Sequence, residues 1–203
     1  MAGLSTSAKG VVNPLVAVVL ISIILVLGWG LLGMTISYLS IVRSEQQLYI
    51  FVSRISSDTY FYIEALSSSE STYTAYVGLL RASGIPTTYY LCILNQTDSR
   101  PIEDENIDVE ISYDEGYRDA SCVTVESDNI YILSQIARYT PLSAEVGVSN
   151  VTLYMVNFTS LEPLSIKVEV EDVDQQPKLM LVLLVPYGQK YYEVKRLYIE
   201  WGG

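Results

Sequence analysis

The chain has 203 residues, which is enough for one domain of ordinary size and a long helix. Its 23 acidic and 12 basic side chains give a net charge of −11, which argues against nucleic acid and against a basic patch for anionic lipid. It contains no histidine and two cysteines, which excludes a Ser-His-Asp triad, a Cys-His pair, His-liganded zinc and a four-cysteine metal site within one chain.

Residues 1–10 form a leader-like segment, small and polar, with one positive side chain at Lys9. From Gly10 to Val42 no Asp, Glu, Lys or Arg occurs, and residues 14–34 are almost wholly Leu, Ile, Val, Ala and Gly. A membrane-spanning helix needs about 20 such residues. The apolar stretch is too long for the apolar region of an ordinary cleaved signal peptide. It therefore predicts a membrane-inserted helix.

An amphipathic pattern continues beyond this stretch without a breaker. The apolar residues at helical spacing are Val42, Leu48, Phe51, Val52, Ile55, Tyr62, Ile63 and Leu66. The pattern predicts one continuous helix over residues 11–66; the alternative is a break near Ser40 followed by a second short helix. Three glycines, Gly28, Gly30 and Gly33, match the G-x-G-x-x-G pattern of dinucleotide-binding proteins, but no strand precedes them and no βαβ unit surrounds them. We expect them to permit close helix packing or to loosen the helix locally.

The remainder, residues 67–203, has the pattern of a β-rich domain. Eight strand-like runs are separated by turn-rich segments: residues 87–94, 107–113, 121–125, 129–133, 150–158, 165–171, 178–185 and 191–201. Short strands at this spacing predict an antiparallel sandwich or small barrel, so the fold class is α+β. Residues 179–185 are apolar at every position, which predicts a central strand covered on both faces.

The two cysteines, Cys92 and Cys122, both fall in the polar, strand-rich half of the chain. Outside the cell a disulfide between them is expected, whereas in the cytosol two buried thiols are the default. Three N-glycosylation sequons begin at Asn95, Asn150 and Asn157, and three sequons in so short a region fit an external surface. We therefore predict the disulfide and a glycosylated exterior.

Two acidic clusters offer oxygen ligands of the kind that Ca²⁺ prefers: Glu103, Asp104 and Glu105, and then Glu169, Glu171, Asp172 and Asp174. Neither has the spacing of an EF-hand loop, and Glu169 and Glu171 alternate as on the solvated face of a strand. The same carboxylates could be paired for glycoside chemistry, but nothing marks a pocket. We expect no metal, no cofactor and no enzymatic activity.

Three features together resemble archaeal type IV pilins and archaellins: a leader that ends in Lys9-Gly10, a hydrophobic helix that opens VVNPLVAVVLISI, and a β-rich C-terminal domain. The resemblance implies that a membrane-bound prepilin-type peptidase cuts after Gly10 and that Val11 is the mature N-terminus. It also implies that the exposed helix joins a bundle of identical helices in the core of a filament, with the β-domain facing outward.

We therefore expect a structural subunit of an extracellular cell-surface filament. Its partners would be copies of itself, the membrane before assembly, the peptidase, and the surface layer or a carbohydrate. The alternative is a single-pass membrane anchor that presents a β-sandwich outside the cell and binds the surface layer. An adhesin that binds carbohydrate through exposed tyrosines is compatible with either.

Overall fold

The computed structural model describes residues 14–69, 71–102, 106–113, 116–134, 138–159, 162–171 and 176–201. This part of the chain contains one long helix followed by a mostly antiparallel, sandwich-like pair of β-sheets, and the fold class is α+β. The chain divides into two compact units after Gln47.

Helix α1 runs from Pro14 to Asp58 without interruption, so the predicted continuity through Ser40 is confirmed. Proline is well tolerated at the first helical position because its missing N–H would have no partner there. The helix ends eight residues before the predicted Leu66, and helix over residues 59–66 is wrong. Strand β1 occupies Thr59–Ser69 and pairs with β2. Aromatic and β-branched residues dominate the start of β1, and they pack well on a pleated sheet.

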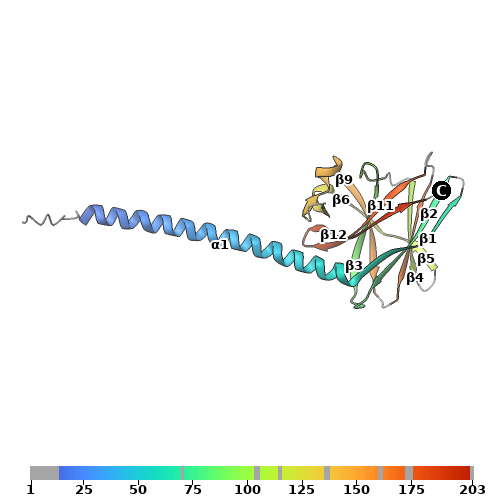
Figure 1. The fold of residues 1–203 in the computed structure, drawn as a ribbon, viewed down its shortest axis with the longest axis horizontal. Helices are drawn as coiled ribbons and strands as arrows, with labels where there is room; N and C mark the ends of the chain where they lie inside the picture. Colours follow the sequence, from blue (N-terminus) through green and yellow to red (C-terminus); the bar gives the residue numbers. More distant parts are fainter. Residues whose placement is uncertain are drawn as a thin grey trace, which may run out of the picture. The chain divides into compact units, whose positions relative to one another are not determined.

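The first sheet has the strand order β1-β2-β10-β4-β5, with antiparallel pairing throughout (Figure 1). Its further strands are β2 (Thr72–Arg81), β10 (Leu164–Val170), β4 (Ile107–Tyr113) and β5 (Gly116–Asp119). Strand β2 lies between β1 and β10 and has no exposed residue, although neither it nor β5 was among the predicted strands.

The second sheet has the order β6-β9-β3-β11-β12-β7-β8. Its strands are β6 (Cys122–Glu126), β9 (Asn150–Phe158), β3 (Thr87–Asn95), β11 (Lys178–Tyr187), β12 (Lys190–Glu200), β7 (Ile130–Leu133) and β8 (Tyr139–Pro141). Strands β12 and β7 pair in parallel, and the other pairs are antiparallel. All eight predicted strands are present within one or two residues at their ends.

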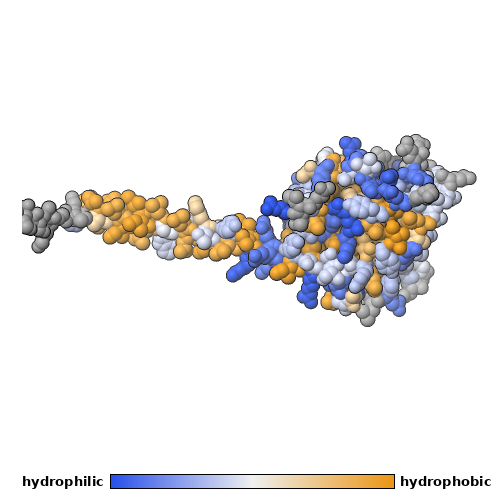
Figure 2. All heavy atoms as spheres, in the orientation of Figure 1, coloured by the Kyte–Doolittle hydropathy of each residue, from blue (hydrophilic) through white to orange (hydrophobic). Residues whose placement is uncertain are grey.

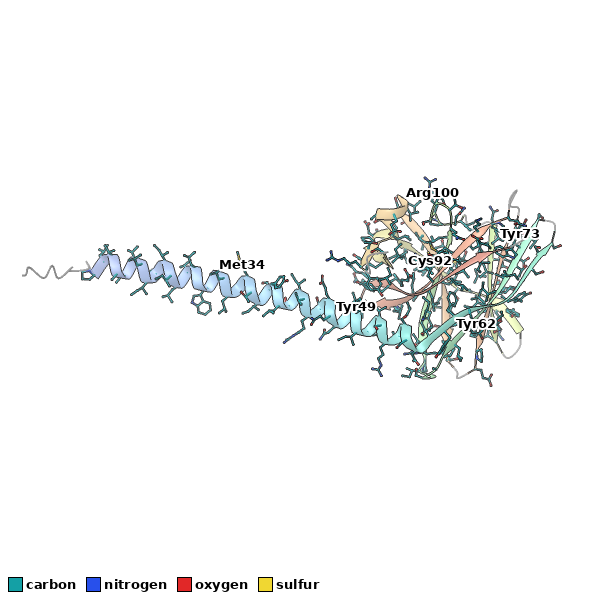
Figure 3. All side chains as sticks on the ribbon, viewed as in Figure 1. Met34, Tyr49, Tyr62, Tyr73, Cys92 and Arg100 are labelled. Carbon is teal, nitrogen blue, oxygen red and sulfur yellow. The ribbon has the colours of Figure 1, made fainter. Side chains whose placement is uncertain are left out.

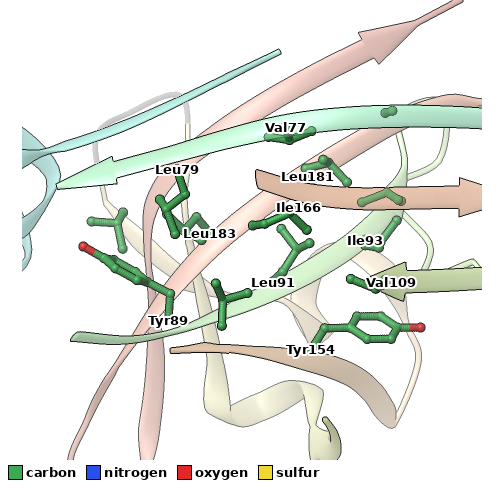
Figure 4. Packing of buried hydrophobic residues seen from close by; sticks show 14 of the residues in the cluster. Val77, Leu79, Tyr89, Leu91, Ile93, Val109, Tyr154, Ile166, Leu181 and Leu183 are labelled. Carbon is green, nitrogen blue, oxygen red and sulfur yellow. The ribbon is translucent and has the colours of Figure 1, made fainter. Parts of the chain in front are cut away.

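The main core lies between the two sheets. Figure 4 shows Val77 and Ile166 of the first sheet facing Leu91, Leu181 and Leu183 of the second. Their side chains are fully buried, and each large apolar side chain moved out of water contributes about 1.5–3 kcal/mol to folding.

A second, smaller core covers the opposite face of the seven-stranded sheet. Strand β7, Leu142 and the short helix α2 (Ser143–Val146) pack there against Met180, Val182 and Leu184. Strand β11 is therefore covered on both faces, as its unbroken apolar run predicts.

Candidate functional site

The part of α1 in the first unit, Pro14–Gln47, has the most unusual surface of the described chain. Its exposed large apolar side chains range from 48% exposed at Val16 to 75% exposed at Trp29, and Val42 is half-buried. Figure 2 shows hydrophobic residues covering the visible face of the helix over its first half, and Figure 3 shows side chains on all sides of it, among them Met34. An exposed apolar surface of this extent marks a site of interaction with lipid or protein.

Length and composition define what this surface can contact. The helix is long and apolar enough to cross a membrane. Its uncharged part, from Pro14 to Val42, is about 43 Å long at 1.5 Å per residue. The hydrocarbon core of a bilayer is about 30 Å thick. A single crossing therefore leaves about two turns of apolar helix over.

Four hydroxyl groups of this helix donate hydrogen bonds to its own backbone carbonyls. The hydroxyl groups of Ser22 and Thr35 donate to the carbonyl oxygens of Val18 and Leu31, each at 2.8 Å. Those of Ser40 and Ser44 donate to carbonyls three residues earlier. A hydroxyl bonded in this way can enter a water-free environment at low cost. The helix is thus chemically suited to burial in lipid or among other helices.

The last turns of α1 belong to the second unit, where they are packed against the β-sheets. Val52 and Ile55 are buried in the main core, and the ring of Phe51 lies 5.1 Å from that of Tyr187. Strand β12 contains an extra residue at Val194, where its pairing with β11 shifts by one. A bulge leaves such a residue unpaired with the neighbouring strand. The hydroxyl of Ser56 donates to the Val194 carbonyl at 2.9 Å, so the helix satisfies it.

The C-terminal end of α1 is held by a clamp made of Asp58, Arg81 and Ser83. The guanidinium Nε of Arg81 donates to Asp58 Oδ2 at 2.9 Å, and the backbone N–H of Ser83 donates to Asp58 Oδ1 at 2.8 Å. The Ser83 hydroxyl also donates to the carboxylate. The hydrogen bonds from Ser83, assisted by Arg81 and opposed by burial, lower the pKa of Asp58. The clamp thus favours the charged carboxylate at a helix end where the backbone dipole disfavours it.

A cleft of about 270 Å³ lies between these last helical turns and strand β12. Its lining includes Tyr49, Ser53, Tyr139, Glu193 and Lys195. Burial and the charge of Glu193 raise the pKa of Tyr139 to about 12, and its hydroxyl donates to the Glu193 carbonyl. The Glu193 carboxylate accepts hydrogen bonds from Arg196 and from the N–H of Leu133. Both groups are therefore engaged structurally and are poorly placed to exchange protons with a substrate.

The three sequons occupy different environments. Asn150 is exposed at the start of β9 and lines a second cleft of about 470 Å³. Asn157 is exposed on the same strand, and its Oδ1 accepts a hydrogen bond from the Thr88 hydroxyl at 2.9 Å. Asn95 is half-buried, and its Oδ1 accepts the N–H of Thr97 at 2.8 Å. Asn150 and Asn157 are thus the more accessible acceptors.

The predicted disulfide is wrong, because Cys92 and Cys122 are both free. Cys92 lies opposite Leu153 on one side of β9, and Cys122 lies opposite Tyr154 on the other. The two cysteines are two strands apart, about 10 Å, and their side chains point to opposite faces of the sheet. A disulfide needs Cα atoms within about 7 Å and convergent side chains. Cys92 is buried in the second core, within the β-domain in Figure 3, whereas Cys122 is exposed.

Several predicted site residues lie outside the described residues. These are the processing residues Gly10 and Val11 and the carboxylates Glu103, Asp104, Glu105, Asp172 and Asp174. Glu169 forms an ion pair with Lys167 at 2.8 Å. Among the described residues, no three His, Cys, Asp or Glu side chains are grouped as a metal site.

One polar network on the outer face of the first sheet was not predicted. The ring of Tyr62 lies over Gly78, where a Cβ atom would come within 2.4 Å of it. Beside it, the Ser165 hydroxyl donates to Glu64 at 2.6 Å and accepts the Tyr117 hydroxyl at 3.1 Å. The strand pairing that joins β1, β10 and β5 across this face is not visible in the sequence. Only the glycine within an apolar strand hints at a close approach.

No protein-family model matches the chain, and no curated protein matches it. Among solved structures, the reeler domain of human F-spondin (fragment 1) is similar over 70% of this chain and 88% of that chain. The two share 9% identical residues with a TM-score of 0.30, and a similarity of this size carries no argument about function.

Proposed function

We propose that this chain is a structural subunit of an extracellular filament of the type IV pilus kind, which polymerises through α1 and presents the β-domain outward. The observation that carries the proposal is the exposed apolar surface of Pro14–Gln47, whose uncharged part exceeds the length of one membrane crossing. The membrane would hold the subunit before assembly.

The energetics are compatible with assembly. Moving the helix from lipid into a bundle brings no hydrophobic gain, because lipid is equally apolar, and the bundle is held by close helix packing. Outside the membrane the bundle keeps each large apolar side chain out of water, which is worth about 1.5–3 kcal/mol per side chain. The apolar stretch carries no ionised side chain that would have to be buried without a partner. The hydroxyls of Ser22 and Thr35 are bonded within the helix, so packing removes little hydrogen bonding to water.

The exterior of the proposed filament would be the acidic β-domain. The exposed positions of Asn150 and Asn157 support a glycosylated surface there. The proposed leader peptide, cut between Gly10 and Val11 by a prepilin-type peptidase, rests on the resemblance to pilins. A surface layer or a carbohydrate is the external partner we propose.

A second candidate is a single-pass anchor that presents the β-domain to the surface layer. The specific observation in its favour is that residues 14–34 span about 31 Å as a helix, which matches one bilayer crossing. In this case lipid, and not a second copy, covers the helix.

Electron microscopy of material sheared from cells, with mass spectrometry of the N-terminal peptide, tests the proposal. Filaments whose subunit begins at Val11 are the expected result. A protein that stays in the membrane fraction as an intact monomer would contradict the proposal and favour the anchor.

A variant at Gly33 separates the two candidates further. A side chain there has open space in the isolated chain. Gly33→Leu makes the helix more apolar and more stable, so a lipid-embedded anchor tolerates it. Closely packed helices do not, because the leucine prevents backbones from approaching. We expect fewer filaments from Gly33→Leu and wild-type yield from the volume-conserving control Leu32→Ile.

A further inference from the structure

Strand β1 is the end strand of the five-stranded sheet and is unusually exposed for a strand of eleven residues. Nine of its residues are exposed, and it contains no lysine and no proline. Its single charged residue is Glu64. Soluble proteins protect such edges with lysine, proline, bulges or short strands. Except for a bulge near Glu64, β1 lacks these devices.

The inward face of β1 is also open over its second half. Ile63 and Leu66 pair with Val77 and Ala75 of β2. The two β2 residues are fully buried, whereas Ile63 is 38% and Leu66 is 39% exposed. The second sheet therefore covers β2 and the first residues of β1, where Thr59 is buried and its hydroxyl bonds that of Tyr89, but it leaves Ile63 and Leu66 exposed. An added strand beside β1 would bury these apolar side chains and pair with the backbone of the edge, of which the Ser67 carbonyl already accepts a hydrogen bond from Trp201.

The other sheet ends of the described chain differ in their capacity to pair. Strand β8 has three residues and contains Pro141, which cannot donate a ladder hydrogen bond. Strand β5 has four residues, among them the charged Arg118 and Asp119. Strand β6, at the end of the seven-stranded sheet, has five, with Val123 exposed and a single charge at its last residue. Of these ends, β6 is the best partner for a strand such as β1.

We propose that β1 of one subunit pairs with β6 of the next, which adds a strand to each sheet between neighbouring β-domains. The inference rests on the proposed filament and names a second contact within it. The two edges differ, so the contact is heterologous and repeats from subunit to subunit, whereas β1 pairing with β1 would close a symmetric dimer. Strands β1 and β6 lie in different sheets and are labelled in separate parts of the β-domain in Figure 1, so one subunit can use both at once.

The exposed thiol of Cys122 on β6 provides the test, because Cys92 is buried and does not compete. Single cysteines are placed at positions 60–69 of β1, one per variant, and assembled filaments are oxidised. Dimers, trimers and longer ladders on a non-reducing gel are expected from one position and, more weakly, from its neighbours on the same face. The ladder should disappear when Cys122→Ser is added. The control Ile85→Cys, on an exposed apolar side chain outside β1, should give no ladder.

Filaments that give no cross-link from any β1 position would overturn the pairing while the proposed function stands. Cross-links that stop at dimers and persist with Cys122→Ser would also overturn it, since β1 would then meet β1. Wild-type material without filaments would contradict the proposed function and the pairing with it.

A second variant tests the same contact without cross-linking. Ile63→Lys should lower filament yield about tenfold, because an inward-pointing charge on an edge strand blocks pairing. The matched control Ile85→Lys should leave the yield unchanged. Equal yields from both variants would count against the pairing.

Discussion

Removal of the Asp58 carboxylate should destabilise the β-domain strongly, although its position at a helix C-terminus suggests the opposite. A negative charge there lowers stability by about 0.3–1 kcal/mol, so removing a carboxylate without hydrogen-bond partners would stabilise the protein. In this structure the carboxylate is the partner of Arg81, whose side chain is 7% exposed, and is itself 21% exposed. Asp58→Ala would leave the buried guanidinium without its ion-pair partner and Ser83 without two acceptors.

The expected loss follows from this burial. Breaking a fully buried ion pair costs about 3–5 kcal/mol, and the partial exposure of Asp58 places this pair at the lower end, at about 3 kcal/mol. With a urea dependence of about 2 kcal/mol/M, the unfolding midpoint should fall by about 1.5 M. The matched control is Asp98→Ala. Asp98 lies 3.7 Å from Arg100 in an ion pair whose side chains are 48% and 69% exposed, and its removal should cost less than about 1 kcal/mol.

The assay is urea unfolding of the full chain in mild detergent, followed by tryptophan fluorescence. Trp201 is buried in the main core and reports on it, and Trp29→Phe removes the signal of the exposed Trp29 in α1. A midpoint for Asp58→Ala that matches that of Asp98→Ala, or that rises, would refute the role of the clamp.

Three further predictions concern the same domain. Because the pKa of Asp58 is lowered in the folded state, ionised Asp58 adds to the free energy of unfolding in full above its unfolded pKa of about 3.9. This added stability is lost as the pH falls through the folded-state pKa. The fall of the urea midpoint in acid should therefore be shallower in Asp58→Ala. Leu181→Ala should cost about 3 kcal/mol in urea unfolding because it opens a cavity in the main core, whereas Leu133→Ala, at a 39% exposed side chain, should cost under about 1 kcal/mol; equal losses would refute the assigned core. Burial raises the pKa of Cys92 to about 12, so maleimide should label Cys122 in the native protein and Cys92 only after unfolding, as mass spectrometry of the peptides can check; equal labelling would contradict the packing of the second core.

Sequence patterns predicted most of the strands because strand signals are local. The alternation in residues 107–113 and the unbroken apolar run of residues 179–185 specify a half-buried strand and a doubly covered strand without reference to any other part of the chain. The apolar stretch at residues 14–34 specifies a helix in the same way. Composition alone thus indicated the candidate assembly surface.

The failures lie where one pattern fits two structures. Tyr62, Ile63 and Leu66 have a spacing that both a helix and an irregular strand can use, and pairing with the buried strand β2 decided for the strand. Cysteine spacing carries no information about which sides of β9 the two thiols occupy. The Asp58 clamp joins residues about 25 positions apart, and neither partner is marked in the sequence.

The sequence by itself determined the long apolar helix, the β-rich character of the rest and the α+β class, because hydrophobic periodicity acts over a few residues. Only the tertiary structure decided the end of the helix at Asp58, the free thiols and the uncovered edge of β1. These features depend on which strands become neighbours. Strand pairing joins residues far apart in the chain. The free energy gained when one strand covers another depends on both strands, so the sequence of either one does not predict it.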